Sequence, residues 1–170
     1  MKKILLFLLI SLVAKAQLSS KAEVVLVTVS PGKELHSAFG HTILWVNDPM
    51  NGIDRAYSYG TFDFNTENFY LKFLMGTLPY TISVHSMQDE FNYNAQYEKR
   101  GMIAQKLQLD SLQKNAIFQA LEKNLLPENR EYAYKFFYDN CSTRIRDMIE
   151  RNAPGKYRWN QSPSLEGKSY

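Results

Sequence analysis

Alternating apolar and polar positions in the first half of the chain predict short β-strands. Residues 23–30 form a β-branched run that ends at a Pro-Gly turn dipeptide. Residues 41–46 alternate strictly, and a polar, glycine-containing cluster at 47–52 then leads into a further run at 53–59. The last two runs predict an antiparallel hairpin. On its first strand, the residues expected to share one face are His41, Ile43 and Trp45, with Thr42, Leu44 and Val46 on the other.

Helical and extended patterns follow one another in the rest of the chain. Together they predict an α+β fold, an antiparallel sheet with flanking helices. One helix opens at Asp110 and ends before Pro127, with an apolar stripe of Leu112, Ala116, Ile117, Ala120 and Leu121. The other expected elements are a helix at 66–74 capped by Thr66, a strand at 80–86, a helix at 88–99, a strand at 101–109, an extended segment at 132–138 and a helix at 141–152.

The first sixteen residues have the three regions of an export signal. Two lysines precede a ten-residue apolar run, which is shorter than the ~20 residues of a membrane-spanning helix, and an Ala-Lys-Ala sequence follows. We therefore expect a cleaved signal peptide at 1–16 and a periplasmic location. The remainder has the length of one domain, predicted at 17–155, with a tail at 156–170 of little apolar content.

Charge and composition narrow the possible partners. The formal net charge is +3, 22% of the residues are charged, and no long basic run occurs, which argues against nucleic acid. The 11 Tyr and 10 Phe suit strand packing, or a surface that meets sugars or lipid head groups.

Cys141 is the only cysteine of this exported chain, so an internal disulfide is excluded, which leaves an inert core thiol, an intermolecular link or a reactive thiol. It opens the predicted helix at 141–152 and shares its inward face with Ile145, Met148 and Ile149. The positive end of a helix dipole favours a thiolate and thus a reactive cysteine. A small, inert core thiol is the alternative, and position alone does not separate the two.

Three histidines are available as a base for this thiol. His41 begins a strand directly after a glycine, and a strand holds an imidazole rigidly enough for proton transfer, so we predict it as the base. His36 and His85 are expected to be structural or surface-exposed. No pair of ligands has the close spacing of zinc sites, so neither a metal nor a cofactor is expected.

Three sequence blocks resemble one known family. Phe39-Gly40-His41-Thr42, the segment Tyr57-Ser58-Tyr59-Gly60-Thr61-Phe62-Asp63-Phe64, and Tyr138-Asp139-Asn140-Cys141-Ser142-Thr143-Arg144-Ile145-Arg146-Asp147 are similar to the Lnb-type N-terminal periplasmic domain, also catalogued as DUF4105. The resemblance spans about residues 21–152. It implies a circularly permuted, papain-related fold of the NlpC/P60 type, in which histidine precedes cysteine, as His41 precedes Cys141 here.

The resemblance also implies a chemistry, lipoprotein N-acylation through a thioester on cysteine. Cys141 would be the nucleophile and His41 the base, while Asn140 and the amides at the helix start would stabilise the oxyanion. Ser58, where many relatives carry Asn, is the candidate for the third catalytic residue, with Tyr57, Tyr59 and Asp63 nearby as alternatives. Arg144 would bind a phosphate or carboxylate, although pairing with Asp147 or Glu150 is an equal alternative.

The expected partners are a phospholipid or lipoprotein as acyl donor or acceptor. Larger members of the family carry membrane-spanning helices, and this sequence has none after the thiol domain. Contact with the bilayer would then come from a membrane-protein partner or a surface patch. Two other functions remain open: a thiol amidase or peptidase of cell-wall peptide, and an inactive domain that binds envelope lipid or peptide.

Overall fold

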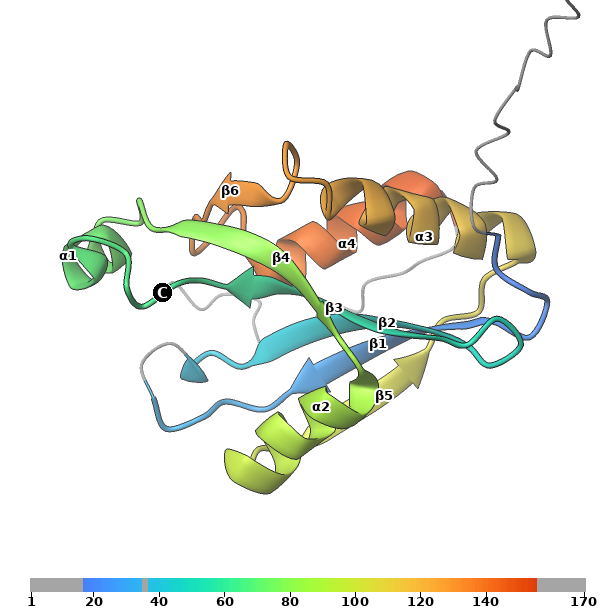
Figure 1. The fold of residues 1–170 in the computed structure, drawn as a ribbon, viewed down its shortest axis with the longest axis horizontal. Helices are drawn as coiled ribbons and strands as arrows, with labels where there is room; N and C mark the ends of the chain where they lie inside the picture. Colours follow the sequence, from blue (N-terminus) through green and yellow to red (C-terminus); the bar gives the residue numbers. More distant parts are fainter. Residues whose placement is uncertain (1–16, 35–36, 156–170) are drawn as a thin grey trace, which may run out of the picture.

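A computed structural model describes residues 17–34 and 37–155, which form one six-stranded antiparallel sheet with helices on both faces (Figure 1). The strand order is β5-β1-β2-β3-β4-β6. The predicted α+β class with an antiparallel sheet is confirmed, whereas the signal peptide and the tail lie outside the described residues. The elements are β1 Glu23–Val29, β2 His41–Asp48, β3 Ile53–Thr61, α1 Phe69–Leu74, β4 Pro79–His85, α2 Met87–Phe91, η2 Asn92–Tyr97, β5 Met102–Lys106, α3 Ser111–Asn124, β6 Glu131–Ala133 and α4 Cys141–Asn152.

The predicted hairpin is the centre of the sheet. β2 and β3 pair antiparallel from Ile43 opposite Ser58 to Asp48 opposite Ile53. Gly52 supplies the positive φ of 64° that the tight turn between them requires. This register places Ser58 on the same face as Ile43, and therefore as His41.

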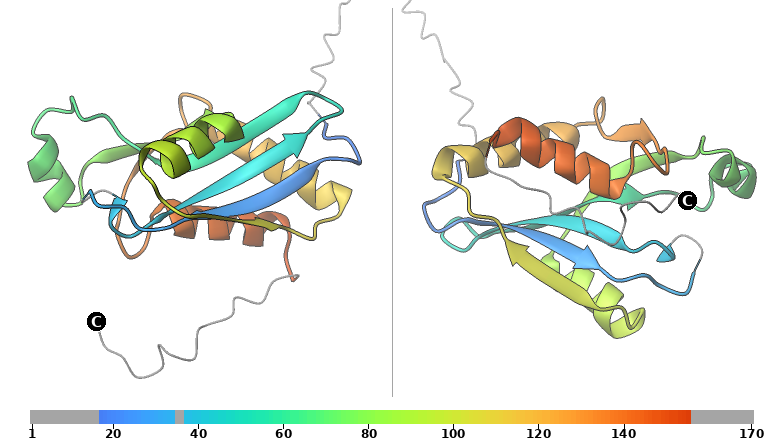
Figure 2. Two further views of the ribbon diagram at one scale, coloured as in Figure 1. Left: turned by 90° about the horizontal axis from the view of Figure 1, so that it is seen from below. Right: turned by 180° about the vertical axis from the view of Figure 1, so that it is seen from behind.

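Each face of the sheet is covered by different helices (Figure 2). α3 and α4 cover one face, where Leu44, Val46 and Tyr57 pack against Ile117 and Ile145 in the main core. α2 lies on the opposite face, above a smaller apolar cluster of Val25, Val27, Val29, Ile43 and Ala56. The predicted inward face of α4 is confirmed, since all four of its residues, Cys141, Ile145, Met148 and Ile149, are buried.

Two helix details differ from the prediction. Leu112 is 83% exposed, and Phe118 joins Ile117 and Leu121 in the core instead. Leu112 precedes Ile117 by five residues, or about 140° around the helix, and so points away from the sheet. α1 begins at Phe69 rather than near Thr66, whose hydroxyl closes a turn onto the Asp63 carbonyl.

Two further segments are shorter or differently coiled than expected. The predicted helix at 88–99 consists of α2 followed by the π-helix η2. The extended segment predicted at 132–138 is wrong beyond Ala133, because the amides of Tyr138 and Asp139 bond to the Lys135 carbonyl and close a turn. This turn delivers the chain to the start of α4.

Candidate functional site

Cys141 occupies the first turn of α4 and is 8% exposed. Cys141 shares its core cluster with Tyr80 and Tyr132, and Tyr134 packs against that cluster. The pKa values of the three tyrosines are raised, first by burial and then by the negative charge that an ionised Cys141 would carry. Burial and the thiolate raise the pKa of Tyr80 to about 12. The thiol is therefore part of the aromatic-rich core on the α4 side of the sheet.

Asn140 caps α4 with its side chain. Its Oδ1 accepts from the amides of Ser142 and Thr143, each at 2.9 Å, and its Nδ2 donates to the Phe136 carbonyl at 2.7 Å. Thr143 Oγ1 accepts from the Asn140 amide in return, which completes a capping box. Asn140 thus fixes the position of Cys141, and its oxyanion role stays a prediction.

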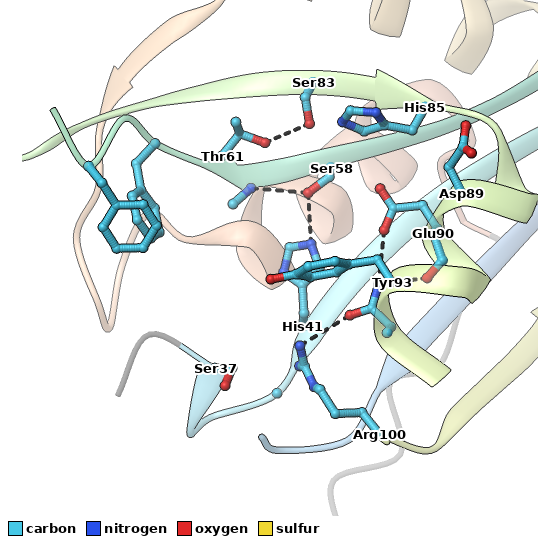
Figure 3. Close-up of a pocket in the computed structure, with 15 residues that line it drawn as sticks. Ser37, His41, Ser58, Thr61, Ser83, His85, Asp89, Glu90, Tyr93 and Arg100 are labelled. Carbon is cyan, nitrogen blue, oxygen red and sulfur yellow. Dashed lines mark hydrogen bonds between the residues drawn. The ribbon is translucent and has the colours of Figure 1, made fainter. Parts of the chain in front are cut away.

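His41 and Ser58 form a hydrogen-bonded pair on the α2 side of the sheet (Figure 3). His41 Nε2 lies 2.8 Å from Ser58 Oγ, which also accepts a longer bond of 3.4 Å from the Gly60 amide. A Cβ at Gly60 would stand 2.7 Å from His41 Cε1, so the close approach of the imidazole requires glycine there. The pKa of His41 is lowered from 6.5 to about 4, mainly by burial and secondarily by the positive charge of Arg100.

The start of β2 separates His41 from Cys141. Thr42, the next residue after His41, faces α4, and its hydroxyl lies 2.8 Å from that of Ser142. Strand alternation turns His41 to the other side, and within the described residues no hydrogen bond joins it to Cys141. The structure thus brings His41 to Ser58 and Cys141 to the tyrosines, and the two groups adjoin at Gly40, which lines a cavity on each side.

Arg144 is already engaged within the protein. Its Nε and Nη2 donate to the two carboxylate oxygens of Asp139 at 2.6 and 2.7 Å, and its guanidinium carbon lies 3.7 Å from the ring centre of Tyr132. Arg146 pairs with Asp147. The ligand-binding role of Arg144 stays a prediction, and any ligand would compete with Asp139.

Two cavities lie on either side of the start of β2, and Gly40 lines both. The first, of about 290 Å³, lies on the Cys141 side and is lined mainly by apolar and aromatic residues, namely Phe39, Gly40, Phe73, Leu74, Gly76, Leu78, Tyr80, Tyr134 and Phe136. The second, of about 460 Å³, has polar or charged residues in most of its wall, among them His41 and Ser58, and is the pocket of Figure 3. His85 lies at its exposed edge, whereas His36 falls outside the described residues.

Neither cavity was predicted from the sequence. Their walls come from segments without a common motif, and only the high aromatic content of the chain hinted at the first. Among residues 17–34 and 37–155, no three His, Cys, Asp or Glu side chains converge as they would to hold a metal ion.

The fold and the two groups define an α+β domain with a candidate thiol site at a helix start and a histidine on a central strand. The chain matches the family described as the Lnb N-terminal periplasmic domain over residues 14–165, and it belongs to that family. This membership supports a periplasmic location. Comparison with curated proteins and with solved structures found no match. None of the described helices is both long and apolar enough to span a membrane.

Proposed function

We propose that this domain is a thiol acyltransferase of the cell envelope, in which Cys141 carries an acyl chain as a thioester. The observation that carries the proposal is the apolar cavity, because its wall residue Tyr80 belongs to the same core cluster as Cys141, and its wall residue Tyr134 packs against that cluster. Cys141 is not itself a wall residue, and in the proposal the carboxyl end of an acyl chain in this cavity is directed toward it. Phospholipid and lipoprotein are the donor and acceptor classes of the proposal.

The surface around the cavity supports a lipid substrate. Large apolar side chains are exposed around it on α1 and on the turn before α4, which is unusual for a surface open to water. Phe39 packs on Phe136 with ring centres 4.5 Å apart, and Phe136 packs on Phe137. We call this surface the aromatic rim; it comprises Phe39, Tyr70, Leu71, Leu74, Met75, Phe136, Phe137 and Tyr138.

The proposed reaction has two steps. First, the Cys141 sulfur attacks the ester carbonyl carbon of the donor, the C–S bond forms, the C–O bond breaks, and the alcohol leaves with the proton of the thiol. Second, an amine attacks the thioester, a C–N bond forms, the C–S bond breaks, and the thiol regains a proton. Asn140 occupies the amides of Ser142 and Thr143, so the N–H of Cys141 is our candidate oxyanion donor.

His41 would move the proton between thiol and leaving group. Its lowered pKa keeps it neutral at pH 7, the form in which it can act as a base. To reach Cys141 it must pass the start of β2 at Gly40, a residue common to both cavities. Catalytic hydrogen bonds are often long before substrate binds, so the lack of direct contact is compatible with this role. A histidine on a strand that precedes a cysteine at a helix start also has the order of permuted papain-like folds.

Binding of lipid without turnover is the second candidate. It is favoured by the position of His41, whose side chain bonds to Ser58 on the side of the sheet away from Cys141. In this case the cavity and the aromatic rim would serve binding alone.

Mass spectrometry of the mature protein after incubation with phospholipid vesicles tests the proposal. We expect a mass increase of one acyl chain on Cys141 that hydroxylamine removes, and no increase in Cys141→Ser. Bound but unreacted lipid would instead establish the binding candidate. Cleavage of cell-wall peptide with no lipid adduct would replace both with a thiol amidase.

A further inference from the structure

The polar pocket on the α2 side contains a buried cation with an unused donor. Arg100 is 8% exposed; its Nε donates to the Ser30 carbonyl at 2.8 Å and its Nη1 to Asn94 Oδ1 at 3.1 Å. Its Nη2 is buried and has no hydrogen-bond partner in the described part of the chain. A buried donor left unpaired destabilises the folded protein, so a ligand that accepts from it would be bound favourably.

The same series of hydrogen-bonded side chains ends at the carboxylate of Glu90. Asn94 Nδ2 donates to Glu90 Oε2 at 3.0 Å, so the Asn94 amide separates the charges of Arg100 and Glu90 instead of letting them pair. Asn94 itself belongs to the π-helix η2, an irregular form that is frequent at functional sites. In Figure 3, Arg100 lies below His41 and Glu90 to its right, and the dashed lines between them mark the two bonds of Asn94.

The charges of the pocket decide which ligand fits. A simple anion would be attracted by Arg100 but repelled by Glu90 and Asp89, and a simple cation would meet the reverse. A molecule with both charges satisfies the two ends together. We propose that this pocket binds a small zwitterion, whose ammonium group contacts Glu90 and whose carboxylate or phosphate contacts Arg100.

Two kinds of molecule share this chemistry: a free amino acid or peptide end, and a phosphoethanolamine head group. The proposal does not depend on the thioester chemistry, because the pocket lies on the other side of the sheet from Cys141. It can therefore be tested on Cys141→Ser as well as on the unmodified protein.

NMR titration of the histidine ring signals of the mature protein tests the site. The probes are phosphoethanolamine and alanine as zwitterions, and inorganic phosphate and ethylamine as the separate charges. We expect a saturable shift of the His41 signal with at least one zwitterion and weaker binding of phosphate or ethylamine. Tighter binding of phosphoethanolamine would assign a head group, and tighter binding of alanine an amino acid or peptide.

Two variants test the contacts. Glu90→Gln keeps the shape of the side chain and should weaken zwitterion binding about tenfold or more, while phosphate should bind more tightly because its repulsion by Glu90 is removed. Arg100→Lys should weaken the binding of phosphate and of the zwitterion alike. If this variant does not fold, the result with Glu90→Gln decides the test. Glu128→Gln, on an exposed loop, is the matched control and should change nothing.

Three results would overturn the proposal. No saturable shift with either zwitterion would mean that Arg100 Nη2 is satisfied by water only. Phosphate that binds as tightly as the zwitterions would leave Glu90 without a role. Unchanged zwitterion affinity in Glu90→Gln would do the same.

Discussion

Thr42 and Ser142, one hundred residues apart, join their hydroxyl groups at 2.8 Å and thereby fasten the start of β2 to the start of α4. Each follows directly after a residue of the candidate thiol site, His41 in one case and Cys141 in the other. The contact brings the two backbones together, while strand alternation directs the imidazole away from α4. The proposed proton transfer must take place around this junction.

Alkylation of Cys141 should depend on His41. In the proposed site the imidazole assists formation of the thiolate, so His41→Ala should slow alkylation at pH 7 by about tenfold or more. The rate is measured by mass spectrometry after timed exposure to iodoacetamide, and the single cysteine makes the product unambiguous.

His85→Ala is the matched control for this experiment, because His85 lies at the edge of the polar pocket and has no proposed role at the thiol. It should label at the rate of the unmodified protein. Equal rates in all three proteins would remove His41 from the thiol site and favour lipid binding without turnover.

The cap of α4 should affect both stability and the thiol. Asn140→Ala removes the acceptor for two amides and should lower the free energy of unfolding by about 0.5–2 kcal/mol. Because the same cap holds the first turn, it should also change the rate of Cys141 alkylation. Urea denaturation and labelling measure the two effects.

Asp110→Ala provides the comparison, because Asp110 closes the equivalent capping box of α3 with Gln113. A similar loss of stability is expected there, with no change in labelling of the folded protein. If both variants change labelling equally, the effect arises from general loosening of the protein and not from the position of Asn140.

The aromatic rim should bind phospholipid vesicles. Phe137 is 73% exposed, and Phe137→Ser should reduce partitioning into vesicles about tenfold, the effect of losing roughly 1.5 kcal/mol of apolar transfer. Cosedimentation with vesicles of phosphatidylethanolamine and phosphatidylglycerol measures it. Leu112 is even more exposed but lies on α3, so Leu112→Ser should partition like the unmodified protein; a matching loss there would indicate non-specific apolar binding.

Stability should fall on acidification through the lowered pKa of His41. The unfolded histidine titrates near 6.5 and the folded one at about 4, so the unfolded state binds more protons between these values. The free energy of unfolding should therefore decrease as the pH drops from 6.5 to 4, by roughly 1–3 kcal/mol from this group. Below pH 4 His41 should contribute no further loss.

Urea denaturation at several pH values, with His41→Gln for comparison, isolates this contribution. We plot the free energy of unfolding against pH. Between pH 6.5 and 4 its slope should be smaller in His41→Gln, because the contribution of His41 is absent, whereas His85→Gln should keep the full slope. An unchanged slope in His41→Gln would show that other groups cause the acid sensitivity.

Local periodicity was sufficient for much of the fold. The alternation at 41–46, the glycine turn and the apolar spacing of α4 predicted the hairpin and the buried face that contains Cys141. These predictions hold because the direction of a side chain within a strand or helix depends only on its position in that element. The same rules missed the exposed Leu112, because they do not tell on which side of α3 the core lies. They also missed the turn at residues 135–139, which backbone hydrogen bonds between near neighbours close.

The sequence by itself determined the elements, the pairing of β2 with β3 and the residues that share each face. Only the tertiary structure decided that α4 covers the face of β2 that contains Thr42. It also showed that Asn140 and Arg144 have hydrogen-bond partners within the protein, and that a cavity lies on each side of the start of β2. The physical reason is that periodicity fixes which side chains point together but carries no information about which helix covers them. That choice depends on the burial of distant segments against one another, as Figure 2 shows for the two faces of the sheet.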